Sequence, residues 1–272
     1  MNRLRANGLE FAYLEWGTGP NLLVLAHGFP DTPHTWSVIG PRLAALGYRV
    51  VAPWLRGYAP TSLPPRDTTS RDLGEDVIGW LDALGAKQAV LVGHDWGVEA
   101  VTAAVGLAPD RVSKLAIIGV PHRTQLPLTP RVAWAGRHFM TFRLPGAVAR
   151  FAANDFAMVD VLCKRWSPTW AFGPDEVREV KRSFAVPGSA HAALGYYRAV
   201  SAITPQFMKA RIAVPTLAIV GEQDPAVSVE DFVRGKRHFT GPYEVAAIPG
   251  GHFCHRESPE QAVDALTKLL QR

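Results

Sequence analysis

The stretch VGHDWGVEA, residues 92–100, joins the end of an apolar run to the start of a helical pattern. Gly93 and Gly97 leave room for a tight, strained turn in which a strand leads straight into a helix and presents one side chain. Such turns usually present a serine, whereas this one presents Asp95. The positive end of the helix would keep the carboxylate ionised, as a nucleophile requires. The stretch therefore predicts an α/β sheet with a carboxylate nucleophile at one strand end, against the alternative that Asp95 only caps a helix.

The order of strands and helices along the chain predicts a doubly wound α/β core. Continuous apolar runs, typical of strands covered on both faces, occur at 21–27, 48–53, 88–94, 114–120, 215–221 and 243–249. Helical patterns occur at 36–47, 70–85 and 96–107. This alternation is typical of a mostly parallel central sheet flanked by helices. A last helix is expected near the C-terminus. Ser258 is its candidate N-cap, Pro259 stands at the first helical position, and Gln261 stands at the capping-box position.

A long connection interrupts this alternation. About ninety residues separate the fifth apolar run from the fourth, whereas connections in α/β folds usually have 2 to 6 residues. The connection carries Trp, Phe and Arg at helical spacing. We therefore predict that residues 124–205 form an inserted helical cap, and that residues 1–123 and 206–272 form the two parts of the core.

The composition predicts a globular protein with one large core, since 47% of the 272 residues are hydrophobic. No stretch approaches the roughly 20 apolar residues of a membrane span, and residues 1–17 alternate like a strand, so we expect a cytoplasmic protein. Cys163 and Cys254 are expected to be reduced thiols. The net charge of +5 comes from scattered arginines, which argues against a nucleic-acid partner. The chain is compatible with a monomer or a homodimer.

The chemistry of a carboxylate nucleophile narrows the reaction. Attack of Asp95 on an ester would give an anhydride, whereas displacement at a saturated carbon gives an alkyl ester. Water must then cleave this ester, which needs a general base and oxyanion donors. His252 lies in a Gly-bracketed loop after the last apolar run, and Asp224 follows the end of another strand. The order nucleophile, acid, histidine is that of the α/β-hydrolase fold, with His255 and Glu222 as the rival base and acid.

Backbone donors for the ester are predicted from two turns. His27-Gly28-Phe29-Pro30 follows the first core strand, where the fold places its second oxyanion donor. We expect the N–H groups of Phe29 and Trp96 to point at the carboxyl of Asp95, unless the first turn only ends a strand. His27 and His94 are read as structural. The HFCH run matches no standard zinc spacing, so no metal site is expected.

Nearly the whole chain resembles the epoxide hydrolase branch of the α/β-hydrolase superfamily, with haloalkane dehalogenases as the nearest relatives. The motifs that carry the resemblance are HGFPDTPHTW, LRGYAPTSLP, VGHDWG, GEQDP, GGHF and ALGYYR. The resemblance implies a small apolar epoxide and water as substrates, an Asp nucleophile, a His–Asp pair that activates water, and no cofactor. It also implies cap tyrosines that protonate the epoxide oxygen, and Tyr197 matches one of them. The alternative is that Tyr197 only packs.

Two departures from the family pattern stand out. Thr141 occupies the place of the other cap tyrosine. Tyr196 and Tyr197 are helical neighbours about 100° apart, so we expect only one of them to face the site. His138, one turn before Thr141, is the candidate to donate in place of the missing phenol. Trp54 replaces an Asp common in relatives, which we expect to affect packing.

Two alternative functions remain open. A haloalkane dehalogenase would use the same displacement by Asp95, although Trp96 argues against the fluoroacetate-specific type, which has Arg there. A hydrolase fold can also bind a small apolar ligand or act in biosynthesis without hydrolytic turnover. An apolar pocket that tolerates aromatic groups is predicted from the cap residues Trp134, Phe139, Trp166 and Trp170.

Overall fold

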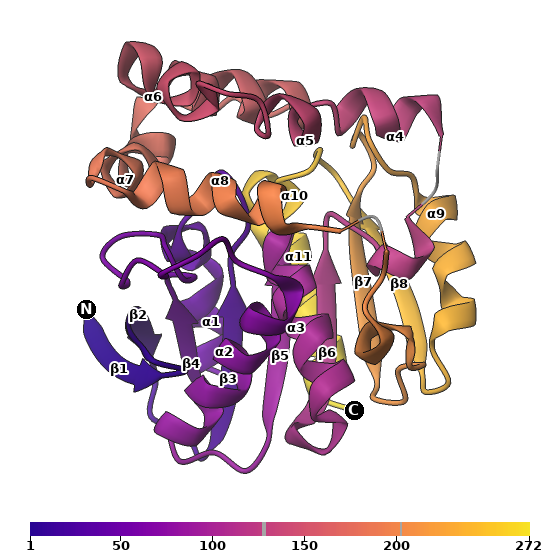
Figure 1. Cartoon of the computed structure of the whole chain (residues 1–272). Coiled ribbons are helices and arrows are strands. Elements are labelled where there is room, and N and C mark those ends of the chain that lie inside the picture. The colour runs from indigo at the N-terminus through magenta and orange to yellow at the C-terminus, as the bar shows by residue number, and fades with distance from the viewer. Residues whose placement is uncertain (127–128, 202) are drawn as a thin grey trace.

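An eight-stranded sheet forms the centre of the molecule (Figure 1). The computed structural model of the chain describes residues 1–126, 129–201 and 203–272. The strands lie in the order β1-β2-β4-β3-β5-β6-β7-β8. The pairs β1–β2 and β2–β4 at one edge are antiparallel, and all the other pairs are parallel. The predicted fold class, a mostly parallel sheet flanked by helices, is therefore confirmed.

The bounds of the elements follow the predicted runs closely. The strands are β1 (Asn2–Ala6), β2 (Leu9–Trp16), β3 (Asn21–Ala26), β4 (Tyr48–Pro53), β5 (Ala89–His94), β6 (Val112–Ile118), β7 (Thr216–Gly221) and β8 (Tyr243–Ile248). The helices are α1 (Ile39–Ala44), α2 (Ser70–Ala83), α3 (Trp96–Leu107), α4 (Pro130–Ala135), α5 (His138–Thr141), α6 (Ala147–Trp166), α7 (Pro174–Ala185), α8 (Ser189–Ala199), α9 (Val229–Gly235), α10 (Cys254–Glu257) and α11 (Pro259–Leu270).

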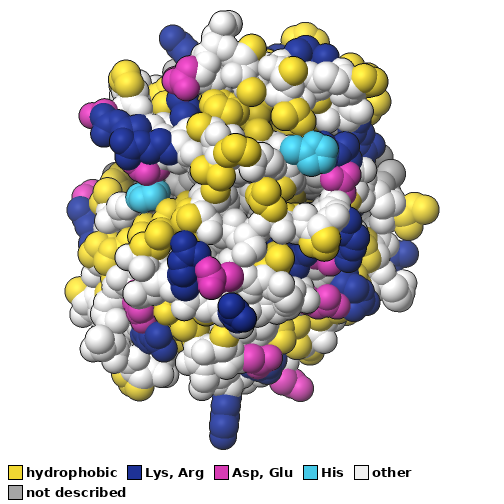
Figure 2. All heavy atoms as spheres, turned by 60° about the vertical axis from the view of Figure 1, so that its left-hand side comes forward, with side chains coloured by type: hydrophobic (Ala, Val, Ile, Leu, Met, Phe, Trp, Pro, Cys, Tyr) yellow, Lys and Arg dark blue, Asp and Glu magenta, His cyan; other side chains and the backbone are white. Residues whose placement is uncertain are grey.

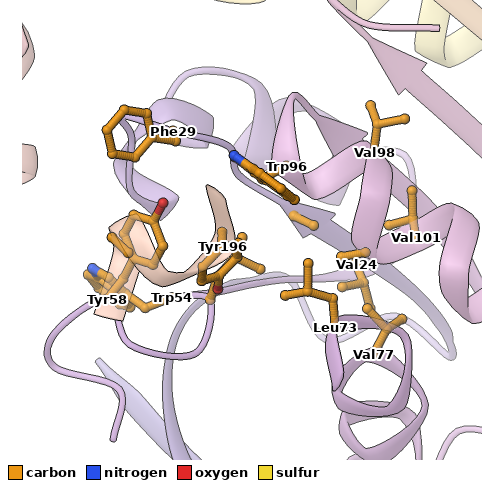
Figure 3. Packing of buried hydrophobic residues seen from close by; sticks show 14 of the residues in the cluster. Val24, Phe29, Trp54, Tyr58, Leu73, Val77, Trp96, Val98, Val101 and Tyr196 are labelled. Carbon is orange, nitrogen blue, oxygen red and sulfur yellow. The ribbon is translucent and has the colours of Figure 1, made fainter. Parts of the chain in front are cut away.

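Two hydrophobic layers enclose the sheet because successive strand residues point to opposite faces. On β3, Val24 packs in the layer of α2 and α3, whereas Leu23 and Leu25 pack in the layer of α1 and α11. Figure 3 shows Val24 beside Leu73 and Val77 of α2 and Val101 of α3. Burial on both faces explains why these strands are continuous apolar runs instead of alternating ones.

One local prediction was right only in part and another was wrong. The helix expected at 36–47 forms over the shorter α1 (Ile39–Ala44), and a 3₁₀ turn (Pro33–Trp36) precedes it. Helix α11 begins at Pro259 as expected, but the Ser258 side chain makes no capping hydrogen bond. Its ψ is 63°, far from the extended value that lets a capping hydroxyl reach the helix, because α10 runs directly into it. The Ser258 N–H instead donates to the carbonyl of Cys254 at 2.8 Å.

Helices α4 to α8, called the cap below, lie between β6 and β7 in the chain and cover one end of the sheet (Figure 1). Hydroxyl groups of the cap hold it to the loop after β4. Ser183 donates to the carbonyl of Ala59 at 2.7 Å, and Ser189 donates to that of Gly57 at 2.9 Å. A cavity lies between the cap and the ends of the strands, as described below.

The surface and the helix lengths bear on possible partners. Figure 2 shows that basic and acidic side chains are interspersed on the visible face of the molecule. Within the described ranges of the chain, no helix is both long enough and apolar enough to cross a lipid bilayer. Cys163 and Cys254 are buried, free thiols.

Candidate active site

The turn between β5 and α3 holds Asp95 in a strained conformation. Its φ is 51° and its ψ is −116°, a region that residues other than glycine rarely adopt. Three glycines make this turn possible. A Cβ atom on Gly97 would lie 2.1 Å from the carbonyl oxygen of Ala26, one on Gly93 would lie 2.3 Å from that of Gly97, and one on Gly28 would lie 2.4 Å from the Cβ of Asp95. Close packing around the turn therefore explains Gly93 and Gly97 in VGHDWG and Gly28 in HGFP.

The two carboxylate oxygens of Asp95 face different partners. The N–H of Phe29 donates to Oδ1 at 2.8 Å, and Nε2 of His252 lies 3.5 Å from Oδ2. Burial raises the pKa of Asp95, but His252, His94 and the Phe29 N–H outweigh it and hold this pKa below its usual value. The structure thus brings Phe29 to the carboxylate as expected. The Trp96 N–H makes no hydrogen bond to it among the described residues.

His252 lies between two carboxylates. Its Nδ1 is 3.4 Å from Oδ2 of Asp224, on the side opposite Asp95. The other oxygen of Asp224 accepts the N–H groups of Ala226 at 2.7 Å and Val227 at 3.3 Å, which orient the carboxylate. Burial disfavours the imidazolium, but Asp224 and Asp95 together outweigh it and raise the pKa of His252 to about 10. The raised pKa favours the imidazolium form of His252 beside an ionised Asp95.

The rival acid and base lie elsewhere. Glu222 is exposed, although it is only two residues from the buried Asp224. His255 is buried away from the nucleophile, with its Nε2 2.7 Å from the hydroxyl of Thr35. Burial lowers the pKa of His255 well below its ordinary value, so it is neutral. The structure therefore groups Asp95 with His252 and Asp224.

A separate buried polar cluster supports the histidine loop. Asp31, His94 and His255 place one potential ligand atom each within 4.8 Å of the others. Nε2 of His94 donates to the carbonyl of His252 at 3.0 Å, which agrees with the structural role expected of His94. The guanidinium of Arg256 lies 3.9 Å from Asp31, and its positive charge disfavours a further cation in the cluster.

The two neighbouring tyrosines of α8 point in different directions. The hydroxyl of Tyr196 donates to the carbonyl of Arg56 at 2.8 Å, inside the core. Figure 3 shows its ring below the indole of Trp96. Tyr197 instead packs its ring against Trp96 and Phe29, with centroids 5.2 Å away in each case. Burial and the charge of Asp95 raise the pKa of Tyr197 well above its usual value, so the phenol keeps its proton.

Of the two polar α5 residues considered above, His138 lines the cavity and Thr141 does not. Thr141 is exposed, and its hydroxyl donates to the carbonyl of His138. His138 is 9% exposed, and its Nδ1 lies 3.2 Å from the carbonyl of Ala135. Because a carbonyl only accepts, Nδ1 carries the hydrogen and Nε2 carries a lone pair. Burial lowers the pKa of His138 to about 4, although the charge of Asp95 opposes this, so the ring is neutral near pH 7.

A cavity of about 220 Å³ opens above Asp95, between cap and core. Phe139 and Trp166 line it, as expected of cap aromatics. Trp134 is 70% exposed and Trp170 packs on Phe253, so the prediction that they line the pocket was wrong. Helical spacing alone does not show which aromatic side chains face inward.

Arg123 is a cavity residue that the sequence patterns did not single out. It donates to Glu99 of α3 at 2.6 Å and to the carbonyl of Ser201, beyond the cap, at 2.7 Å. The guanidinium thus connects the core to the segment that follows α8. Its position beside the cavity depends on contacts far apart in the chain, which no local motif encodes.

The chain is similar over nearly its whole length to proteins with known structures or curated names. Residues 21–259 match the family described as alpha/beta hydrolase fold. The chain is 31% identical to Epoxide hydrolase 3 of Siraitia grosvenorii, covering 95% of this chain and 94% of that protein. It is 29% identical to Epoxide hydrolase A of Mycobacterium tuberculosis, covering 97% and 95%. The crystal structure of Epoxide Hydrolase A from Mycobacterium thermoresistibile superposes with a TM-score of 0.81 at 28% identity, covering 99% and 97%.

The fold and the family match together define the class of protein as an α/β hydrolase. Full-length similarity to the curated relatives carries the assignment one step further. The chain belongs to the epoxide hydrolase branch of the α/β-hydrolase superfamily. The expected family and enzyme class are thereby confirmed.

Proposed function

We propose that the protein hydrolyses small apolar epoxides to vicinal diols through a covalent ester on Asp95, and that it needs no cofactor. One observation carries the proposal. The carboxylate of Asp95 has one oxygen held by the Phe29 N–H and the other facing His252, which is backed by Asp224. This arrangement suits a nucleophile that is first alkylated and then hydrolysed.

In the first step, Oδ2 of Asp95 attacks a ring carbon of the epoxide. A new C–O bond forms while the ring C–O bond breaks, and the ring oxygen takes a proton. Tyr197 is the proposed source of that proton, since it is a protonated phenol close enough to Asp95 for the carboxylate to raise its pKa. Tyr197 packs edge-to-face against Trp96 and Phe139. Both of these rings line the cavity, whereas Tyr197 is not among the described residues that line it, so the epoxide oxygen has to pass these rings to reach the phenol.

In the second step, water attacks the carboxyl carbon of the ester and gives a proton to His252. The resulting oxyanion forms on Oδ1, where the Phe29 N–H already donates at 2.8 Å. Collapse of this intermediate releases the diol oxygen, which takes the proton from His252. The regenerated carboxyl group then loses its proton, and Tyr197 recovers its own.

Alkylation itself switches His252 from an acid to a base. In the resting protein, Asp224 and Asp95 both help to raise the pKa of His252 to about 10. Once Asp95 is an ester, its negative charge is gone and the opposing effect of burial remains. The pKa of His252 therefore falls, and the imidazolium gives its proton to solvent water, from which His252 takes a proton back when the Asp95 carboxylate is regenerated. The neutral imidazole needed to accept a proton from the attacking water thus forms after the first step.

A single turnover in heavy-oxygen water tests the covalent route. With enzyme in excess, we expect the first diol to contain no heavy oxygen from water, because its new oxygen comes from Asp95. The label should appear instead in the peptide that contains Asp95, as measured by mass spectrometry. Heavy oxygen in the diol of the first turnover would show direct attack by water and refute the proposal.

Replacement of Tyr197 by Phe tests the acid. We expect alkylation of Asp95 by an epoxide to slow by roughly a hundredfold or more, within the range for general acid catalysis by one positioned group. The measurement is the pre-steady-state rate of ester formation. Tyr196→Phe is the matched control, because its hydroxyl donates to Arg56 inside the core. That control should lose about 1 kcal/mol of stability but keep its alkylation rate. An unchanged rate in Tyr197→Phe would remove Tyr197 from the mechanism.

Dehalogenation is the second candidate, favoured by two indoles. Trp96 and Trp166 both line the cavity, and indole N–H groups can stabilise a departing halide. A halide leaves without a proton, so Tyr197→Phe should barely affect any haloalkane activity. Halide release with haloalkanes, and no diol from epoxides, would favour this candidate. Absence of both activities would favour ligand binding without turnover.

A further inference from the structure

The outer surface of the cap exposes large apolar side chains on and beside α4 and α5. Trp134 is 70% exposed, Met140 is 67% exposed and Leu144 is 54% exposed. These three residues are called the cap patch below. Figure 1 shows α4 and α5 at the top of the view, on the side of the cap away from the sheet. A single exposed apolar residue needs no explanation, but several in one short segment indicate a surface that binds a partner.

The same segment carries only positive charge. From α4 to the first turn of α6 it contains four arginines and no Asp or Glu. Arg131 pairs with the carboxylate of Asp231. Arg137, Arg143 and Arg150 form no ion pair with a described residue, and each donates to backbone carbonyls instead. A carbonyl does not neutralise a guanidinium, so the surface around the cap patch attracts anions.

The arginines and the indole of the patch lie close together. The guanidinium of Arg137 lies over the ring of Trp134, 4.1 Å from its centroid. Burial and the charge of Arg137 both lower the pKa of Arg165 on α6, which shows that like charges gather here. Trp is enriched where a bilayer meets water, and Arg binds phosphate groups. A second copy of the chain suits the patch less well, because a two-fold axis would bring the same basic surfaces together.

The cavity opens beside the cap patch. Phe139, the neighbour of Met140 in the chain, lines the cavity and is also 37% exposed. Leu126 likewise lines the cavity and is exposed. The apolar surface is therefore continuous from the outside of the cap into the site.

We propose that the cap patch docks on the surface of an anionic phospholipid bilayer. The apolar side chains of the patch enter the boundary between headgroups and acyl chains, and the three arginines without carboxylate partners bind lipid phosphates. The protein then lies on the bilayer without crossing it. Under the proposed function, docking turns the cavity mouth toward the phase in which apolar epoxides dissolve.

Flotation with lipid vesicles tests the apolar part of the inference. The vesicles contain either phosphatidylcholine alone or an equimolar mixture with phosphatidylglycerol. We expect the natural protein to float with the mixed vesicles only, and high salt to weaken this binding because it screens charge. Trp134→Ser should weaken binding at least about tenfold, since a large apolar side chain no longer leaves water. Val233→Ser on α9, also exposed, is the matched control and should bind like the natural protein.

A second pair of variants tests the charges. Arg150→Gln should weaken binding about fivefold, the contribution of one basic residue close to an anionic surface. The control is Arg5→Gln, which removes an exposed arginine of β1 that forms no ion pair with a described residue. Equal losses in the two variants would show that the net charge alone drives binding and would overturn the inference.

Two further outcomes would also overturn it. One is that the natural protein does not float with the mixed vesicles. The other is a dimer in light scattering that Trp134→Ser converts to a monomer, because a second copy then covers the patch. Circular dichroism checks folding, and Met140→Ser replaces Trp134→Ser should the latter not fold. Flotation needs no substrate, so its result is independent of whether the protein hydrolyses epoxides.

Discussion

Asp95→Asn is expected to fold and to form no diol, with a loss of at least about 10⁴-fold in kcat, as found when a nucleophile is removed. An amide does not displace carbon from an epoxide. The fold should survive because Asn tolerates a positive φ better than most residues, and Asp95 has a φ of 51°. The amide oxygen can still accept the Phe29 N–H. Steady-state diol formation and the mass of the protein after exposure to substrate provide the measurement.

The control for this variant is Glu222→Gln. Glu222 is an exposed carboxylate near the site in sequence, and its replacement should leave kcat unchanged. The Asn protein must be assayed fresh, with its mass checked, because deamidation restores Asp95. Near-normal steady activity in a sample shown to contain Asn would exclude Asp95 as the nucleophile.

His252→Gln is expected to separate the two chemical steps. Asp95 should still be alkylated, because Oδ1 keeps its hydrogen bond to the Phe29 N–H. Hydrolysis of the ester should slow by about 10²- to 10⁴-fold, the usual contribution of a general base. The ester then accumulates and is measured as a mass increase equal to that of the substrate. Normal turnover, or a folded protein that cannot be alkylated, would contradict the assignment of the base.

The matched control is His255→Gln, the rival base three residues away. His255 contacts Thr35 and lies in the buried cluster, so we expect it to affect stability without trapping the ester. Accumulation of ester in His255→Gln, and not in His252→Gln, would exchange the two roles.

In the natural protein, ester hydrolysis should slow as the pH falls, because His252 must be neutral to accept a proton. The pKa that governs this step should lie below the value of about 10 in the resting state.

Much of the fold and part of the site could be predicted because they depend on local chemistry. Strands buried on both faces must be apolar throughout, so the runs that became β3, β5 and β7 were visible in the sequence. The turn at Asp95 needs glycines because a Cβ atom at these positions would lie only 2.1 to 2.4 Å from neighbouring atoms, and that requirement leaves a motif. The chemistry of a carboxylate in that turn then limited the reactions to consider.

The tertiary structure decided the choices between residues that are close in the sequence. Glu222 and Asp224 have the same functional group, but only Asp224 is buried against His252. His138 and Thr141 are one helical turn apart, and packing of the cap brings His138 to the cavity while Thr141 is exposed. Composition and spacing determine which elements form and which chemistry is available. Which side chain meets another depends on contacts between segments far apart in the chain, and these exist only once the cap has packed on the core.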